Sequence, residues 1–225
     1  MTSPPGGEST RRRPVAVPIA ALVAATGLGI TAAFGGFSEA PQEPPKQLGP
    51  GASLDQGEFT TKFVESRTVF QPDQFGGEGK RFLEVELQVT NKGDETTGVG
   101  FPRYGKTSGV FFAASLLKMT PAIADESGPT VSVPGRSVPS RQLHPDLPAT
   151  VVLRYELEPR QHAPKQVQYD VGTFEFSAGA IKNVKRDWLL VKDGDEADSP
   201  PKVVAQVTLP VRQAGNLPAR QAGNL

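Results

Sequence analysis

The 225-residue sequence contains no cysteine and only two histidines. Without cysteine, the chain is excluded from disulfide bonding, thiolate zinc sites, CxxC redox chemistry and catalysis by a cysteine nucleophile. His144 and His162 stand among prolines in expected loops, and two histidines cannot build a three-histidine zinc site. The G-x-S-x-G elbow of serine hydrolases is also lacking. We therefore expect no enzyme: no catalytic, cofactor-binding or metal-ligating residues, and a fold stabilised by its hydrophobic core.

An excess of positive charge is lacking as well. The chain has 24 Lys and Arg against 24 Asp and Glu, and from residue 51 to 211 the counts are 18 against 21, a net charge of −3. This balance does not favour nucleic acid or an anionic membrane surface as a partner. Long stretches of helical periodicity are missing too, whereas 24 glycines and 22 prolines interrupt the chain. The pattern predicts an all-β domain.

One long hydrophobic segment is present near the start of the chain. Residues 15–37 form 23 consecutive residues without a charge, directly after arginines 11–13. A helix of this length spans about 35 Å, enough for a hydrocarbon core of about 30 Å. Because arginines precede the segment and Glu39 and Glu43 follow it, the N-terminus is expected in the cytoplasm and the rest of the chain outside. The sequence therefore predicts a single-pass, membrane-anchored protein with an extracellular C-terminal domain.

Two interpretations of this segment remain open. A secretory h-region usually has about 7–15 residues, so the length favours an uncleaved signal anchor. The Ala- and Gly-rich composition and the small residues at 31–33 also fit a cleaved signal peptide, which would make the same domain a secreted binding protein. Residues 10–12 resemble a twin-arginine signal, but Pro14 stands where a large apolar residue is expected.

Composition divides the chain into five parts. A cytoplasmic tail (1–13) and the transmembrane signal anchor (14–37) are followed by a Pro-rich spacer (38–56). Residues 57–211 have the length of one domain. The end of the chain, 212–225, repeats the hexapeptide Arg-Gln-Ala-Gly-Asn-Leu and is expected to be a disordered tail.

Alternation of apolar and polar residues marks the strands of the domain. Leu83, Val85, Leu87 and Val89 alternate with polar residues, as in a strand with one buried face, and Asn-Lys-Gly-Asp at 91–94 then predicts a turn. The expected strands are 59–70 as one or two strands, 81–90, 151–158, 166–176 with a bulge at Gly172, and 188–191 with 203–209 as a hairpin around an acidic loop. The apolar run 109–120 fits either a strand or a buried helix.

Three segments together resemble a known family. They are Gly57 to Phe63, the strand Phe82 to Val89 that runs into Thr-Asn-Lys-Gly, and Leu143 to Leu153. Their order is similar to that of the immunoglobulin-like extracytoplasmic domains of unknown function in bacterial, notably actinobacterial, membrane-anchored proteins and lipoproteins. The resemblance implies an antiparallel immunoglobulin-like β-sandwich over about residues 55–211 and no catalytic residues. Residues 101–145 are additional to the usual length of that family.

One short motif matches a nucleotide-binding pattern. Residues 100–107, Gly-Phe-Pro-Arg-Tyr-Gly-Lys-Thr, fit the phosphate loop G-x-x-x-x-G-K-[ST]. In such a loop, Gly105, Lys106 and Thr107 would hold phosphate and Mg²⁺, but the motif must lie between a buried strand and a helix. Here a polar turn precedes it, and Pro102 removes one backbone N–H. A nucleotide-binding protein is therefore the alternative hypothesis.

Two other features have a structural and a functional interpretation. Asp193, Asp195, Glu196 and Asp198 carry enough oxygen ligands for calcium, but their spacing is not that of an EF-hand and favours a solvated loop. Aromatic residues are most simply part of a sandwich core, whereas an exposed patch from 101–120 would indicate a partner site. The aromatic residues expected in the core are Phe111, Phe112, Phe174, Phe176 and Trp188.

These observations favour a non-enzymatic domain that binds a protein or cell-envelope partner. Residues 101–145 are the expected contact region, because long loops on a rigid scaffold tend to carry function. A passive spacer in the envelope is a further, purely structural alternative.

Overall fold

The computed structural model describes residues 43–73, 75–123, 128–135, 138–177, 187–194, 196 and 198–213. The expected cytoplasmic tail, the expected membrane anchor, the first residues of the spacer and all but two residues of the C-terminal tail lie outside these ranges. In the part of the chain that is described, no helix is long and apolar enough to cross a membrane.

The expectation of an all-β fold is confirmed in the described residues, which form strands and one short 3₁₀ helix. The elements are β1 Lys46–Leu48, β2 Ser53–Asp55, β3 Phe59–Gln71, β4 Lys80–Asn91, β5 Thr97–Gly98, η1 Phe112–Ser115, β6 Leu116–Thr120, β7 Thr130–Ser132, β8 Gln142–Leu143, β9 Pro148–Leu157, β10 Gln166–Val171, β11 Phe174–Ser177, β12 Asp187–Leu190 and β13 Ala205–Gln213.

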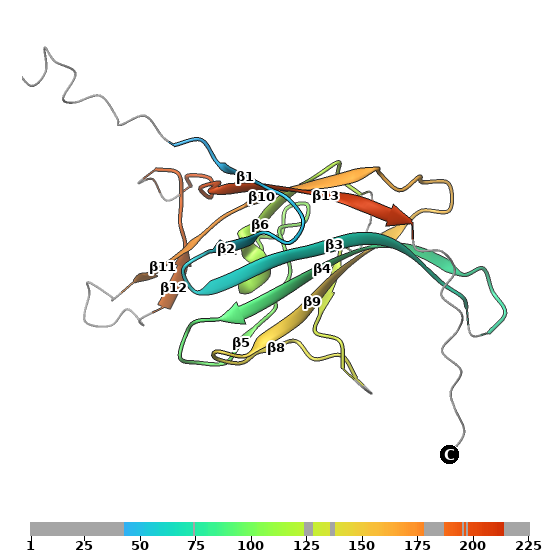
Figure 1. Cartoon of the computed structure of the whole chain (residues 1–225), viewed down its shortest axis with the longest axis horizontal. Helices are drawn as coiled ribbons and strands as arrows, with labels where there is room; N and C mark the ends of the chain where they lie inside the picture. The colour runs from blue at the N-terminus through green and yellow to red at the C-terminus, as the bar shows by residue number, and fades with distance from the viewer. Residues whose placement is uncertain are drawn as a thin grey trace, which may run out of the picture. The chain divides into compact units, whose positions relative to one another are not determined.

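Nine of these strands form one continuous sheet that turns back on itself (Figure 1). Its order is β6-β10-β13-β3-β4-β9-β7, with β1 added to β13 and β2 added to β3. Strand β13 makes the turn, because its first half pairs with β10 whereas Val211–Gln213 pair in parallel with β3. The group β6-β10-β13 and the group β3-β4-β9-β7 share one hydrophobic core. Across that core, the hydroxyl groups of Tyr155 on β9 and Tyr169 on β10 are 3.0 Å apart and hydrogen-bonded.

The two strands with the clearest alternation, β4 and β9, lie side by side in the sheet. Each has one buried apolar face, as predicted. In β4 the apolar residues at 83, 85, 87 and 89 are all buried, and in β9 the residues at 151, 153, 155 and 157 are buried. Asn91 ends β4 and begins the predicted turn, where its Oδ1 accepts a hydrogen bond from the backbone N–H of Gly93 at 2.9 Å.

Strand β3 is a single long strand with a bulge between Phe63 and Glu65. Before the bulge, Phe59 and Phe63 point into the core; after it, Ser66 does. Without the extra residue, the period of two would direct Glu65 and Arg67 into the core. The bulge therefore places these two charged residues on the outer face of the sheet.

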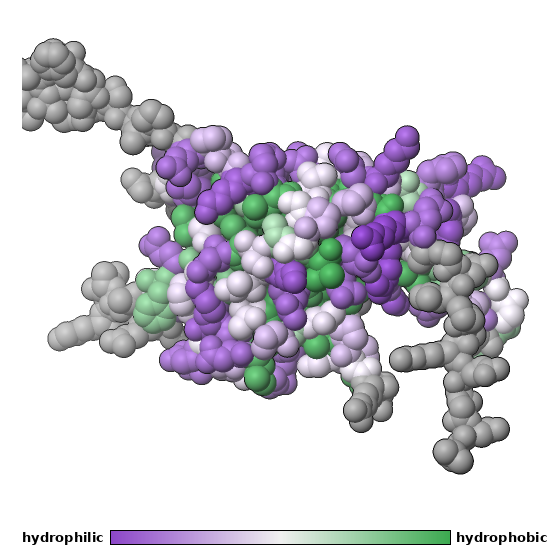
Figure 2. Space-filling model, in the orientation of Figure 1, coloured by the Kyte–Doolittle hydropathy of each residue, from purple (hydrophilic) through white to green (hydrophobic). Residues whose placement is uncertain are grey.

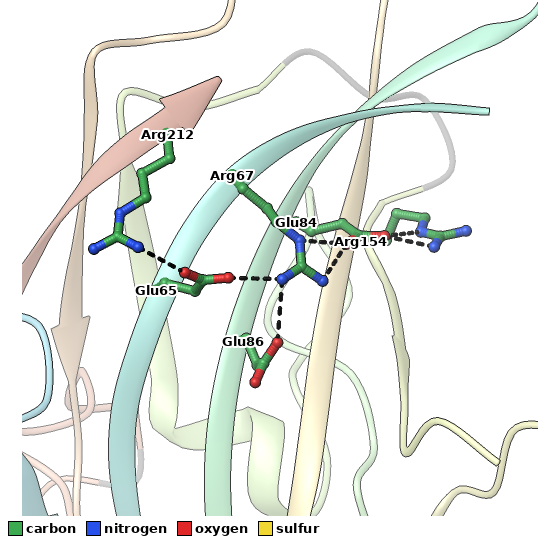
Figure 3. A network of polar contacts seen from close by, with 6 residues as sticks. All are labelled: Glu65, Arg67, Glu84, Glu86, Arg154 and Arg212. Atoms are coloured by element: carbon green, nitrogen blue, oxygen red, sulfur yellow. Dashed lines mark hydrogen bonds and ion pairs between the residues drawn. The ribbon is translucent and has the colours of Figure 1, made fainter. Parts of the chain in front are cut away.

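Six charged side chains form a network on that outer face (Figure 3). Glu84 lies at its centre, with its carboxylate oxygens 3.2 Å from Arg67 Nη2 and 3.0 Å from Arg154 Nε. Arg67 also contacts Glu65 at 2.6 Å, and Arg212 on β13 contacts Glu65 at 3.3 Å. The Glu84 side chain is only 6% exposed, although its position in β4 faces outward. The network has equal numbers of positive and negative charges and joins four strands, so we interpret it as structural.

We expect Glu84→Gln to lower the free energy of unfolding by about 2 kcal/mol, between the ~1 kcal/mol of a surface ion pair and the 3–5 kcal/mol of a fully buried one. The neighbouring Glu86 is the matched control: it lies 3.5 Å from Arg67 and is 28% exposed, so Glu86→Gln should cost under about 0.5 kcal/mol. Urea denaturation of both variants checks this. Equal losses would show that Glu84 gains nothing from its central position.

Several expectations about pairing were wrong. β12 pairs with β11 and β13 pairs with β10, so residues 188–191 and 203–209 are not a hairpin, although a single bridge between Lys192 and Pro201 closes the acidic loop between them. Residues 166–176 form two strands rather than one bulged strand. They separate at Gly172 because its carbonyl accepts a hydrogen bond from Gln56 Nε2, and the N–H of Phe174 donates to the Gln56 carbonyl.

The segment expected to be a spacer and the segment expected to be a contact loop both contribute strands. The second half of the predicted spacer forms β1 and β2, which pair with β13 and β3. The 101–145 segment, predicted to be an added contact loop, supplies η1, β6, β7 and β8. The ambiguous run 109–120 within it is both helical and extended, since η1 leads directly into β6.

Candidate functional site

A groove of about 840 Å³ lies beside the end of β4 and the start of β3. Its walls are the turn 93–98, the segment 109–114 and the β11–β12 hairpin, and Glu58 also lines it. β5, β11 and β12 mark this end of the domain in Figure 1, and Figure 2 shows apolar side chains where the β11–β12 hairpin lies. We call this feature the aromatic groove.

Two of the five aromatic side chains expected in the core are instead exposed in the groove. Phe112 and Phe174 are buried, as expected, and both ring centroids lie within 5.4 Å of Phe59. Phe111 and Phe176, in contrast, are 59% and 49% exposed. Phe174 and Phe176 both lie on β11 of the two-stranded β11–β12 sheet, but only Phe174 packs into the core.

Trp188, the single tryptophan of the chain, lines the groove. Its ring contacts Phe176 edge to face, with centroids 5.4 Å apart. The indole lies beside two glycines: a Cβ atom on Gly57 would lie 3.2 Å from Trp188 Cζ3, and one on Gly93 would lie 3.6 Å from Nε1. The same Gly93 position lies 3.8 Å from Glu58 Cγ, so both side chains pass beside Gly93.

Phe111 is held in a strained backbone conformation. Its φ of 53° and ψ of −146° lie close to a region that only glycine occupies readily. Such strain costs about 1–3 kcal/mol and tends to persist at functional sites. The strained conformation turns the Phe111 ring outward over Gly98, where a Cβ atom would lie 3.1 Å from the ring. The exposed position of Phe111 is therefore imposed by the fold.

We expect Phe111→Gly to be more stable than Phe111→Ala by about 1 kcal/mol or more, the reverse of the usual order, because only glycine relieves the strain. Both substitutions remove the same exposed ring, so the comparison isolates the backbone. Thermal unfolding of the two variants measures the difference. Equal stability, or a more stable alanine variant, would show that the conformation carries no strain.

The described residues that line the groove carry negative charge and no positive charge. Burial, and secondly the charge of Asp187, raise the pKa of the Glu58 carboxyl group to about 7. Asp94 and Glu95 also line the groove, and no Lys or Arg does among the described residues. The nearby Lys92 is engaged elsewhere, since its Nζ lies 2.7 Å from a carboxylate oxygen of Asp55.

The phosphate-loop-like segment lies next to the groove but has a different geometry from a phosphate loop. The N–H of Tyr104 donates to the carbonyl of Thr107 at 3.2 Å, and the N–H of Thr107 donates back at 2.9 Å. Residues 101–110 thus form a small hairpin, with Gly105 and Lys106 at its tip. No helix begins directly after Thr107, since η1 starts at Phe112. The strand–loop–helix arrangement that phosphate binding needs is not formed here.

The other polar residues considered from the sequence do not gather into a site. In the described ranges, no three His, Asp or Glu side chains are placed to hold one metal ion, and Asp195 of the acidic loop lies outside those ranges. His144 Nδ1 is 3.0 Å from Thr96 Oγ1, and His162 is exposed.

A second, smaller hollow of about 260 Å³ lies between the 102–105 segment and β6. Its inner wall includes Tyr155 and Tyr169, and burial raises the pKa of Tyr169 well above its ordinary value. Both hydroxyl groups are used in the hydrogen bond across the core. This hollow therefore differs from the aromatic groove, because its charged lining residues, Arg103 and Lys118, are positive.

Sequence reasoning pointed to the groove only in part. It singled out Trp188, Phe111 and Phe176, but not Glu58 or Asp187, which become neighbours through folding and carry no local motif. The chain matches no protein-family model, no curated protein and no solved structure.

Proposed function

We propose that the domain is an immunoglobulin-like β-sandwich. In chain order, its seven main strands are β3, β4, β6, β7, β9, β10 and β13. If these are strands A to G, one group of neighbours reads A-B-E-D and the other reads C-F-G. That is the strand arrangement of a constant-type immunoglobulin domain. The parallel pairing of the first and last of these strands fits the same assignment.

We propose further that the protein is a non-enzymatic, membrane-anchored binding protein whose domain lies outside the cell, with the aromatic groove as its partner site. The uncharged segment 15–37 after three arginines supports the location. Sandwich domains commonly bind through the loops at one end, and the groove lies between such connections. A cleaved, secreted form of the same domain is the alternative, with the same binding role.

One observation carries the proposed binding role. Large apolar side chains from separate parts of the chain, Phe111, Phe176 and Leu189, are each about half exposed or more and line the same groove. Clustered exposed aromatic surface of this kind marks interaction sites on soluble domains, whereas a single exposed residue does not.

Photo-crosslinking in intact cells tests the binding role. A benzophenone amino acid replaces Phe111 in one variant and Phe75 in the other; Phe75 is 96% exposed and lies in the β3–β4 connection, away from the groove. We expect a discrete, light-dependent adduct at position 111 and none of comparable yield at position 75. Equal yields at both positions, or no adduct at either, would contradict the assignment of the groove as the partner site.

A further inference from the structure

We propose that the aromatic groove seats an extended, cationic segment of a partner polypeptide, with a Lys or Arg side chain between Glu58 and Asp187 and against the rings of Phe176 and Trp188. The proposal rests on the proposed function, since it takes the groove to be the partner site and names the chemistry of the partner.

Charge is the first argument. Four carboxylates line the groove, and among its described lining residues there is no Lys or Arg to balance them. Lys92, which directly precedes the turn that lines the groove, is held by both oxygens of Asp55 at 2.7 and 2.8 Å. The described lining therefore presents negative charge to a partner group, and complementarity favours a positive one.

The aromatic rings provide the second argument. Phe176 and Trp188 meet at an angle of 62°, so the pair presents both a ring edge and a ring face. Ammonium and guanidinium groups bind to aromatic faces, most strongly to tryptophan. Glu58 and Trp188 line the same groove, so a cation held by the carboxylate lies near the aromatic surface. Charge and aromatic surface thus recognise the same group.

The shape of the groove favours a polypeptide over a small headgroup. All four residues of β12 line it. Among the described residues β12 pairs with β11 alone, so its other edge has no partner strand. Extended segments add to such edges through main-chain hydrogen bonds, while neighbouring pockets select their side chains. A volume of about 840 Å³ accommodates several residues of an extended chain.

Binding is expected to depend on pH through Glu58. Among the described residues, Asp187 on β12 is the charged group that acts on Glu58, and Asp94 and Glu95 line the same groove; Lys92 is paired with Asp55. A cation binds the ionised carboxylate, so its affinity falls as Glu58 takes up a proton. With a pKa of about 7, the apparent Kd at pH 6 should be about tenfold that at pH 8.

The single tryptophan makes the test direct, since all indole fluorescence of the chain comes from Trp188. The full chain in zwitterionic nanodiscs is titrated with three acetylated pentapeptide amides: Lys-Phe-Lys-Phe-Lys, the same peptide with Glu for Lys, and the same with Gln. We expect a saturable fluorescence change with the Lys peptide, at least tenfold weaker binding of the Gln peptide and no binding of the Glu peptide. Equal binding of all three would overturn the proposal.

Variants separate recognition from folding. Glu58→Gln should weaken binding of the Lys peptide about tenfold at pH 8 and remove the pH dependence, whereas Glu78→Gln, an exposed residue far from the groove, should leave both unchanged. Thermal unfolding at pH 8 should be no lower for Glu58→Gln than for the unsubstituted chain, because the change removes a carboxylate whose ionisation the fold disfavours.

Other outcomes overturn the proposal in recognisable ways. Unchanged affinity of Glu58→Gln would remove the charge argument, and a saturable response to an N-acetylglucosamine tetramer in place of the Lys peptide would make the groove a carbohydrate site. If no peptide binds but the crosslink at position 111 still forms in cells, the cationic partner is wrong and the proposed function stands.

Discussion

Replacing Gly100 with alanine should destabilise the domain by about 3 kcal/mol or more, whereas the same change at Gly105 should cost about 1 kcal/mol. Both glycines have positive φ, +66° and +54°. A Cβ atom on Gly100 would lie 1.9 Å from the carbonyl oxygen of Val110, but one on Gly105 meets nothing within 4 Å. Val110 cannot move freely, because its N–H donates to the Phe101 carbonyl and its neighbour Phe111 forms a wall of the groove.

Chemical denaturation of the two alanine variants measures this difference.

Substitutions in the phosphate-loop-like motif, to which both glycines belong, also separate the two functional hypotheses. A nucleotide site would lose Mg-ATP-dependent stabilisation in Gly105→Ala and in Lys106→Ala, although neither change should disturb the fold much. A thermal shift with Mg-ATP in the unsubstituted chain that Lys106→Ala abolishes would favour nucleotide binding and contradict the proposed function.

The second large effect is expected at Asn91. This side chain is fully buried; its Nδ2 donates to the carbonyls of Glu95 and Leu143 at 2.8 and 3.1 Å, and its Oδ1 accepts from Gly93. Asn91→Asp removes both donated hydrogen bonds and places a negative charge against two carbonyl oxygens. We expect a loss of about 3 kcal/mol or more at pH 7, and a smaller loss for Asn91→Ala.

The pH dependence of Asn91→Asp gives a further check. The new carboxyl group is buried beside carbonyl oxygens, so its folded-state pKa is raised above the unfolded value. The penalty is then complete above the folded-state pKa and decreases as the pH falls below it, because the protonated group donates a hydrogen bond again. Unfolding measured between pH 4 and pH 8 should therefore show the variant recovering stability toward acid relative to Asn91→Ala. A constant difference between the two variants would contradict this account of the turn.

Strands whose signal is local could be predicted from the sequence. β4 and β9 alternate cleanly over their length, and the turn at Asn91 uses side-chain chemistry that operates within a few residues. Pairing is not local: nothing in the residues around Trp188 indicates that they pair back to β11 rather than forward to β13. The short strands β1 and β2 were assigned to the spacer because prolines and glycines surround them, although both pair with longer strands.

The bulge in β3 had a signal that was overlooked. A strict period of two from Phe59 and Phe63 would bury Glu65 and Arg67, which is physically unfavourable, so a shift of one residue was required between Phe63 and Glu65. The groove could not be predicted in the same way. Its aromatic residues were recognisable as either core or partner surface, but the choice depended on the positive φ of Phe111, and the meeting of Glu58 with Asp187 depended on the whole fold.

The location of the domain is the claim on which the proposed function depends, and one measurement tests it directly. Cells that carry the full chain with a tag after Leu225 are treated with protease from outside and then fractionated. We predict full-length protein in the membrane fraction, with the tag removed by the protease; truncated protein in the medium would indicate cleavage and a secreted form of the same domain. A tag that stays protected in intact cells but is cleaved after lysis would place the groove in the cytoplasm and contradict the account.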